Sequence, residues 1–192
     1  IATLVRRKMR AYRVPGVGLG ISVGGVATLR TFGVTSLDDP RPVTNDTLFT
    51  MASISKTITA TAVMRLVELG VLDLKTPIQR YLPEFRVLDD DTSRHVTLWH
   101  CLTHTPGWEG QLTTEDRGGE ALAHFAASVM RTLPQLAPAG SVWSYNNAGF
   151  ALTGRVIEVV TRKSIHEALR ELVSAPLGLT RTVTRLTDAM TW

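Results

Sequence analysis

The segment that decides the fold is Leu48–Leu69, which reads LFTMASISKTITATAVMRLVEL. After Lys56 nearly every residue is apolar or small, and Arg65 and Glu68 are the only charged residues before Gly70. This pattern predicts a helix that is buried on most of its circumference. Gly70 supplies its natural stop.

Ser53 and Lys56 lie three residues apart at the start of this segment. On a helix their side chains would lie about 60° apart on one face, so the hydroxyl and the amine could meet. A lysine activates a serine only if burial or positive neighbours lower its pKa, and the helix dipole acts in that direction. The same dipole would stabilise an oxyanion near the Ser53 amide. The spacing alone equally fits a Ser53 helix cap and a Lys56 that reaches water.

The composition is that of an ordinary globular protein, with 192 residues of which 44% are hydrophobic. The chain can bury a core as one domain or the larger part of one. Its net charge of +4 has a local origin: five of the 21 basic residues lie in the first 13 positions, and the other 16 nearly balance 17 acidic residues. A solvated helix face explains this run, and no track for nucleic acid is expected.

Cys101 is the only cysteine, so neither an internal disulfide nor a thiolate metal cluster is expected. That leaves an extracytoplasmic (periplasmic or secreted) and a cytoplasmic location both open. The sequence contains neither a run of about 18 apolar residues nor a signal sequence, so no membrane span is predicted. The chain begins with Ile1 and not with methionine, which fits a processed chain or a fragment.

The N-terminal part predicts a short amphipathic helix over residues 1–13, ended by Pro15-Gly16. Two β-branched runs, 17–23 and 26–34, then flank Gly24-Gly25, which is the signal of a two-residue β-hairpin. This hairpin is the only β-structure that the sequence predicts. Farther along, helices are expected over 119–133, from about residue 147 to 160, and over 164–173.

A motif with two histidines lies on a predicted helix from Leu98 to His104, capped by Thr97. His100 and His104 have the i, i+4 spacing of two zinc ligands. However, Cys101 stands where a zinc protease would have glutamate, and no third ligand is evident. Packing histidines are therefore expected, and neither a metal nor an organic cofactor is predicted.

Five segments occur in an order that resembles the serine β-lactamase and penicillin-binding-protein superfamily, in its class C-like branch with family VIII esterases and D,D-peptidases. They are Val14–Val17, Phe49–Lys56, Leu82–Phe85, Leu102–Gly107 and Tyr145–Asn147. The resemblance implies an α+β fold of the β-lactamase/transpeptidase type. Residues 1–50 would form the N-terminal helix and β-hairpin, and residues 51–192 a helical region that carries the S-x-x-K and Y-x-N motifs.

The resemblance also implies roles for four residues. Ser53 would attack an ester, β-lactam or small amide carbonyl, Lys56 would help take its proton, and Tyr145 would act as general base and then as proton donor. Asn147 would hydrogen-bond Lys56 and the substrate. Which of Lys56 and Tyr145 takes the proton first stays open, as does the choice between a hydrolase, an acyltransferase and a non-catalytic binding or assembly protein.

One family feature is missing from this chain. Nothing after Asn147 matches the third motif, a Lys-Thr-Gly or His-x-Gly strand that supplies the second oxyanion amide and belongs to the central sheet. Loss of one oxyanion donor typically costs about 10²- to 10³-fold in turnover. We therefore expect 1–192 to be an incomplete domain, poorly active alone, with a C-terminal remainder as a continuation or a second chain.

Three tryptophans, Trp99, Trp108 and Trp143, lie near the motif segments. Together they would line an apolar acyl pocket, or they would belong to the core; the sequence leaves both readings open.

Overall fold

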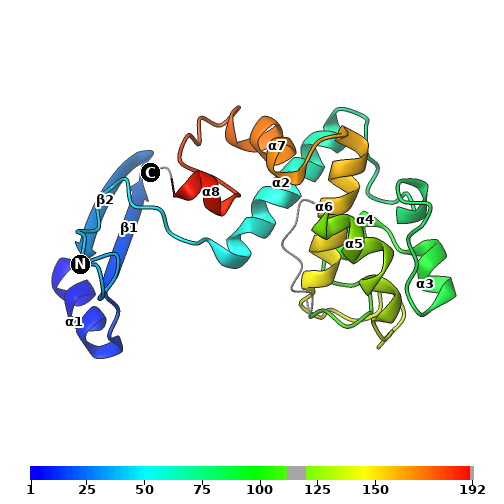
Figure 1. Ribbon diagram of the computed structural model, residues 1–192, viewed down its shortest axis with the longest axis horizontal. Helices are drawn as coiled ribbons and strands as arrows, with labels where there is room; N and C mark the ends of the chain where they lie inside the picture. Colours follow the sequence, from blue (N-terminus) through cyan, green and yellow to red (C-terminus); the bar gives the residue numbers. More distant parts are fainter. Residues whose placement is uncertain (112–119, 191–192) are drawn as a thin grey trace. The chain divides into compact units, whose positions relative to one another are not determined.

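The computed structural model describes residues 1–111 and 120–190. The chain divides into two compact units, one formed by residues 1–50 with the segment from Val183 onward, the other by residues 51–182 (Figure 1).

The first unit contains the predicted N-terminal helix and hairpin. Helix α1 spans Ala2–Tyr12, strands β1 and β2 span Gly16–Val23 and Val26–Gly33, and the short helix α8 spans Leu186–Ala189. The strands pair antiparallel from Gly16↔Gly33 to Val23↔Val26. Gly24 and Gly25 connect them with φ of 56° and 81°, which a two-residue hairpin turn requires. The predictions of the helix and the hairpin are confirmed.

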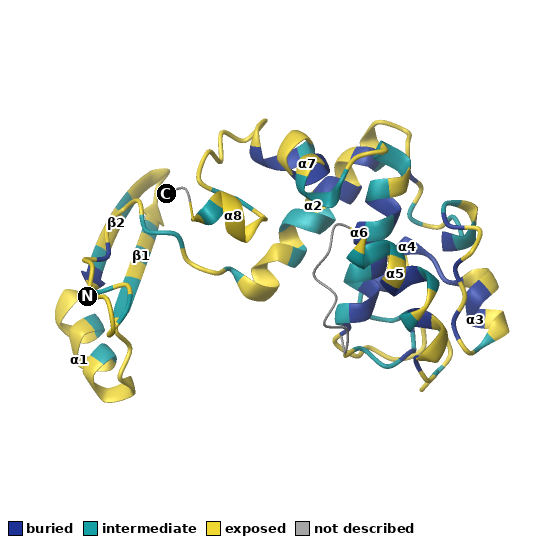
Figure 2. Cartoon of the chain, in the orientation of Figure 1, coloured by how far each residue is buried: buried dark blue, intermediate teal, exposed yellow. Residues whose placement is uncertain are grey.

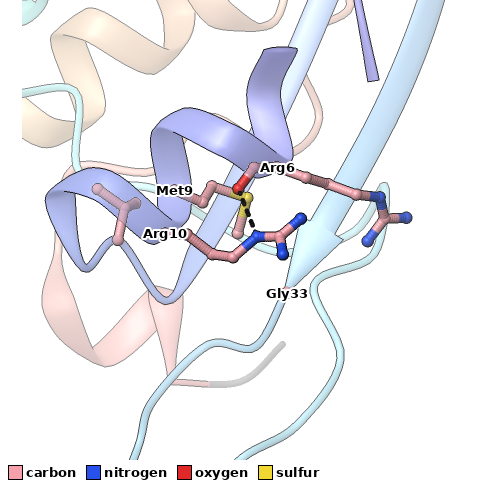
Figure 3. A pocket seen from close by; sticks show the side chains of 5 residues that line it. Arg6, Met9, Arg10 and Gly33 are labelled. Carbon is pink, nitrogen blue, oxygen red and sulfur yellow. Dashed lines mark hydrogen bonds between the residues drawn. The ribbon is translucent and has the colours of Figure 1, made fainter. Parts of the chain in front are cut away.

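The basic residues of α1 lie on an exposed helix, since α1 has no buried residue (Figure 2). The Arg6 guanidinium stacks 5.3 Å from the Phe32 ring centroid. A pocket of about 280 Å³ opens beside it and is lined by Arg6, Met9, Arg10, Val14 and Gly33 (Figure 3). In these contacts the arginine side chains lie along apolar surface while α1 stays exposed to solvent, as expected of a solvated helix face.

The second unit is helical. Its elements are η1 (Ala52–Ile54), α2 (Ser55–Glu68), η2 (Ile78–Arg80), α3 (Asp90–His95), α4 (Leu98–Leu102), α5 (Ala121–Ala127), η3 (Val129–Thr132), α6 (Asn147–Thr161), α7 (Ile165–Leu169) and the π-helical turn η4 (Arg170–Ser174). The predicted 119–133 helix is thus two shorter helices, and Gly119 lies outside the described residues.

Helix α6 is the central element of this unit, and α2, α4, α5 and α7 all pack against it (Figure 1). Its apolar residues recur at helical spacing, so that Ala148, Leu152 and Val156 are fully buried (Figure 2). Beside α6 the core contains the ring pair Phe85 and Trp108, with centroids 6.1 Å apart. Residues 144–146 lead directly into this buried helix, and residues 104–110 hydrogen-bond to its start.

Helix α2 ends where predicted but is less buried than predicted. Gly70 has φ of 70°, and its amide donates to the Val67 carbonyl, which ends the helix. The described buried residues of α2 are Ala62, Val63 and Leu66, whereas Met64 is 49% exposed. The expectation of burial on most of the circumference is wrong for this unit, because α2 packs on one side, against α6, α7 and η4.

None of the described helices is long and apolar enough to cross a membrane. Among the described residues the two strands of the hairpin form the only sheet.

Candidate active site

Ser53 lies in the turn η1, immediately before α2, and its side chain is exposed. The residue before it, Ala52, has φ of 45°, in the left-handed region that side chains other than hydrogen disfavour by about 1 kcal/mol. The Ile54 amide donates to the Met51 carbonyl at 3.0 Å, which closes the turn. Such local strain is typical of functional positions. Here it sets the direction in which the chain presents Ser53.

The four residues expected from the sequence lie together. The Lys56 ammonium donates to Ser53 Oγ at 3.3 Å and to Asn147 Oδ1 at 2.7 Å. The Tyr145 hydroxyl donates to Ser53 Oγ at 2.5 Å. A residue pair on one helical turn is thereby joined to a pair about 90 residues away, because α2 packs against α6. The roles of the four residues stay a prediction.

Lys56 is half-buried and faces two aromatic rings. Its Nζ lies 4.7 Å from the Tyr145 ring centroid and 5.5 Å from that of Phe150. Contacts of this kind stabilise an ammonium charge through the quadrupole of the ring. The Lys56 side chain thus lies among two rings and the Asn147 amide oxygen.

Tyr145 is 44% exposed, and its phenol has a lowered pKa. Hydrogen bonding to Lys56 is the largest cause, followed by the Ser53 hydroxyl, and both favour the phenolate. A phenol with a lowered pKa directly on a serine hydroxyl is suited to accept the proton of that serine.

Asn146, between the two predicted site residues, is fully buried and caps α6. Its Oδ1 accepts from the Gly149 amide at 2.7 Å and from Trp108 Nε1 at 3.2 Å, and its Nδ2 donates to the Trp108 carbonyl at 3.0 Å. The cap of α6 is therefore Asn146, the residue before the predicted site residue Asn147. Because Asn146 provides the cap, Asn147 can direct its side chain to Lys56.

Gly110 also holds the Tyr145–Asn147 segment in place. Its carbonyl accepts from the Asn147 amide at 2.8 Å. A Cβ at this position would lie 2.6 Å from the Tyr145 carbonyl oxygen and 3.0 Å from Asn146 Cα. Only glycine allows this close approach of two backbones.

The two histidines have separate structural tasks. His100 Nδ1 accepts from the Thr97 amide at 3.1 Å and forms a capping box at the start of α4. His104 Nδ1 accepts from the Asn146 amide at 3.0 Å, and its ring lies 4.7 Å from the Tyr145 ring centroid. The sequence placed His104 among packing residues, and its closeness to Tyr145 was missed. Among the described residues, no group of three or more His, Cys, Asp or Glu is placed to hold a metal.

The three tryptophans differ in how far they are buried. Trp108 is 1% exposed and belongs to the core, where the indole N–H binds Asn146. Trp99 and Trp143 are 52% and 66% exposed. The reading as core holds for Trp108 alone.

Comparison with known proteins places this chain in a family. A family model described as Beta-lactamase matches residues 1–191. Penicillin-binding protein 4 of Amycolatopsis lactamdurans is 37% identical over 180 residues, which cover 93% of this chain and 47% of that protein. Esterase EstB of Burkholderia gladioli is 37% identical over 175 residues, covering 81% of this chain and 43% of the esterase.

The crystal structure of the D-alanine carboxypeptidase AmpC from Burkholderia cenocepacia matches with a TM-score of 0.80 at 28% identity, covering 97% of this chain and 50% of that one. The predicted β-lactamase/transpeptidase-like fold is thereby confirmed. The chain spans about half the length of the relatives that it matches. By sequence and by fold, this chain belongs to the Beta-lactamase family.

Proposed function

We propose that this chain carries the nucleophile of a serine hydrolase that forms an acyl-enzyme on an ester, a β-lactam or a small amide. The observation that carries the proposal is the contact of Ser53 Oγ with both the Tyr145 hydroxyl, at 2.5 Å, and the Lys56 ammonium, at 3.3 Å. Relatives named as a penicillin-binding protein, an esterase and β-lactamases support the same reaction class.

In the proposed reaction Tyr145, as the phenolate, takes the proton of Ser53. Two observations favour Tyr145 over Lys56 in this role. The phenol has a lowered pKa, whereas the Lys56 Nζ already donates to Asn147 Oδ1 at 2.7 Å and faces two rings. Lys56 then acts as the positive charge that keeps the phenol acidic.

Once Ser53 Oγ has bonded to the carbonyl carbon, the bond to the leaving group breaks and Tyr145 returns its proton to that group. Water, or another acceptor, then gives its proton to Tyr145 and bonds to the acyl carbon. The bond from that carbon to Ser53 Oγ breaks, and Tyr145 returns the proton to Oγ, which restores both residues. The Ser53 amide, at the start of a helix, is one donor for the oxyanion.

The second oxyanion donor is expected from a part of the protein outside this chain. Nothing after Asn147 matches the third motif of the family, and the matched relatives are about twice as long. An isolated two-stranded hairpin such as β1–β2 is at best marginally stable and gains from further strands. We therefore expect the chain alone to acylate about 10²- to 10³-fold more slowly than the full-length protein.

The test is the intact mass of the full-length protein after incubation with a fluorophosphonate and, separately, with a penicillin. Ser53→Ala should abolish the adduct, because it removes the nucleophilic oxygen. Ser55→Ala is the matched control, since Ser55 is an exposed serine on the same turn, and it should keep the adduct. A penicillin adduct would favour the β-lactam and peptidase substrates, and a fluorophosphonate adduct alone would favour esters. Labelling that survives in Ser53→Ala would contradict the proposal.

A further inference from the structure

His104 binds both ends of the segment that carries Tyr145. Its backbone carbonyl accepts from the Ser144 amide at 2.9 Å, and its ring Nδ1 accepts from the Asn146 amide at 3.0 Å. Tyr145 lies between these two anchored residues. One residue therefore fixes the backbone on both sides of the phenol.

The ring of His104 also contacts the phenol itself. Its centroid lies 4.7 Å from that of Tyr145, with the planes inclined by 33°, and 5.3 Å from that of Phe150. Both of these rings face the Lys56 ammonium. His104 thus packs against the two rings that form the surroundings of Lys56.

These contacts require a strained backbone and a neutral imidazole. His104 has φ of 59°, a left-handed conformation that few residues with side chains adopt. An Nδ1 that accepts an amide N–H has no proton of its own. Burial and then the nearby Lys56 charge lower the pKa of His104, although the Asn146 contact opposes this. Among the described residues that face the His104 ring, Lys56 and Tyr145 are titratable, and Phe150 and Trp143 are not.

We propose that His104 is a positioning residue for Tyr145: its neutral imidazole accepts the Asn146 N–H and packs on the phenol, and so holds the Tyr145 hydroxyl on Ser53. This inference rests on the proposed function, in which that hydroxyl moves the proton. His104 does not touch Ser53 and takes no proton in the reaction.

Three variants separate the two contacts. His104→Ala removes the acceptor and the ring. His104→Asn retains an acceptor close to the position of Nδ1 and tolerates positive φ, whereas His104→Phe retains a ring without an acceptor. His100→Asn is the matched control, because His100 lies on the adjoining helix α4, four residues before His104, and its Nδ1 serves the cap of that helix.

The first readout is the pKa of the Tyr145 phenol in the full-length protein, followed by NMR of ¹³C-labelled tyrosine and assigned with Tyr145→Phe. His104→Ala should raise this pKa, since the phenol would lose its fixed contacts with Lys56 and Ser53. The second readout is the rate of fluorophosphonate acylation, which should fall by up to about 100-fold. His104→Asn and His104→Phe should each restore part of both, and His100→Asn should leave both unchanged.

Unchanged phenol pKa and acylation in His104→Ala would overturn the inference. The inference would also be overturned if all three His104 variants lost acylation rate equally and in proportion to their fall in melting temperature. A general structural role of His104 would then explain the loss. A phenol pKa that responds to His104 in a protein that forms no Ser53 adduct would uphold the positioning role and refute the proposed function instead.

Discussion

The two halves of the candidate site are built in different ways. Ser53 and Lys56 lie one turn apart at the start of α2, and Ser53 is exposed. Tyr145 and Asn147 flank the fully buried Asn146. Residues 144, 146 and 147 hydrogen-bond to the distant segment 104–110 and so hold this half in place. The first half therefore depends on helix geometry, and the second depends on tertiary packing.

This difference matters for function because the reacting contact joins the halves. The phenol reaches Ser53 only if the 144–147 segment keeps its place relative to α2. Substitutions far from Ser53 but within the buried half should thus affect the site, whereas exposed substitutions near the motif should not.

The largest effect is expected for Trp108→Ala. Trp108 is 1% exposed and binds Asn146 through its indole N–H and its backbone carbonyl. The variant should lower the free energy of unfolding by about 3–5 kcal/mol, measured with urea on the full-length protein. Trp99→Ala is the control, because Trp99 is 52% exposed, and it should cost less than about 1 kcal/mol. Equal losses of unfolding free energy in the two variants would show that the burial of Trp108 does not stabilise the Tyr145–Asn147 half.

Gly110→Ala should displace the Tyr145–Asn147 segment. The new methyl group would lie 2.6 Å from the Tyr145 carbonyl oxygen, so one of the two backbones must move. A shift of about 1 Å at a reacting group can cost about 100-fold in rate, and we expect acylation to fall by about 10- to 100-fold.

Gly20→Ala is the matched control for Gly110→Ala. A Cβ at Gly20 meets only Leu29, at an ordinary 3.6 Å. It should leave the rate of fluorophosphonate acylation unchanged. Wild-type acylation by Gly110→Ala would show that the buried half does not constrain the phenol.

Lys56→Met should move the pH dependence of acylation towards higher pH. The active form in the proposed reaction is the Tyr145 phenolate, so activity is lost as the pH falls through the phenol pKa. Lys56 is the largest cause that lowers this pKa, and its removal raises it. The pH profile of fluorophosphonate labelling measures the shift. Lys75→Met, at an exposed lysine outside the site, should leave the profile in place. An unchanged acid limb in Lys56→Met would rule out Tyr145 as the base.

The smallest effect is expected for thiol reagents. Cys101 is fully buried beside α6, and burial raises the pKa of its thiol to about 12. Iodoacetamide should therefore leave the folded chain unlabelled and label it completely in denaturant. Cys101 should be labelled faster in Trp108→Ala than in Trp99→Ala, because removing the Trp108 side chain opens the core that contains Cys101. Rapid labelling of the wild type would contradict the packing of this half.

Much of the local structure was predictable because it depends on short-range rules. The Gly24-Gly25 turn requires positive φ, and Gly70 ends α2 for the same reason. The i, i+3 spacing of Ser53 and Lys56 placed both on one turn. The burial of α2 was overestimated, since an apolar pattern indicates which residues can be buried and not which neighbours cover them.

The other half of the site could be named only through family resemblance. Asn146 and Asn147 are adjacent and chemically identical, so the sequence could not say which one caps α6 and which one reaches Lys56. His104 lies in a family-like segment and has a zinc-like spacing to His100, but neither feature pointed to Tyr145, because its partner amide is 42 residues away.

The sequence by itself determined the helices, the hairpin turn and the serine–lysine pair, because each arises from interactions between residues a few positions apart. Only the tertiary structure decided that Tyr145 contacts Ser53, that Asn146 is the cap and that His104 packs on the phenol. These contacts depend on how α4 and α6 pack and on how closely Gly110 approaches residues 145 and 146. They join segments far apart in the chain, and no local pattern encodes such distances.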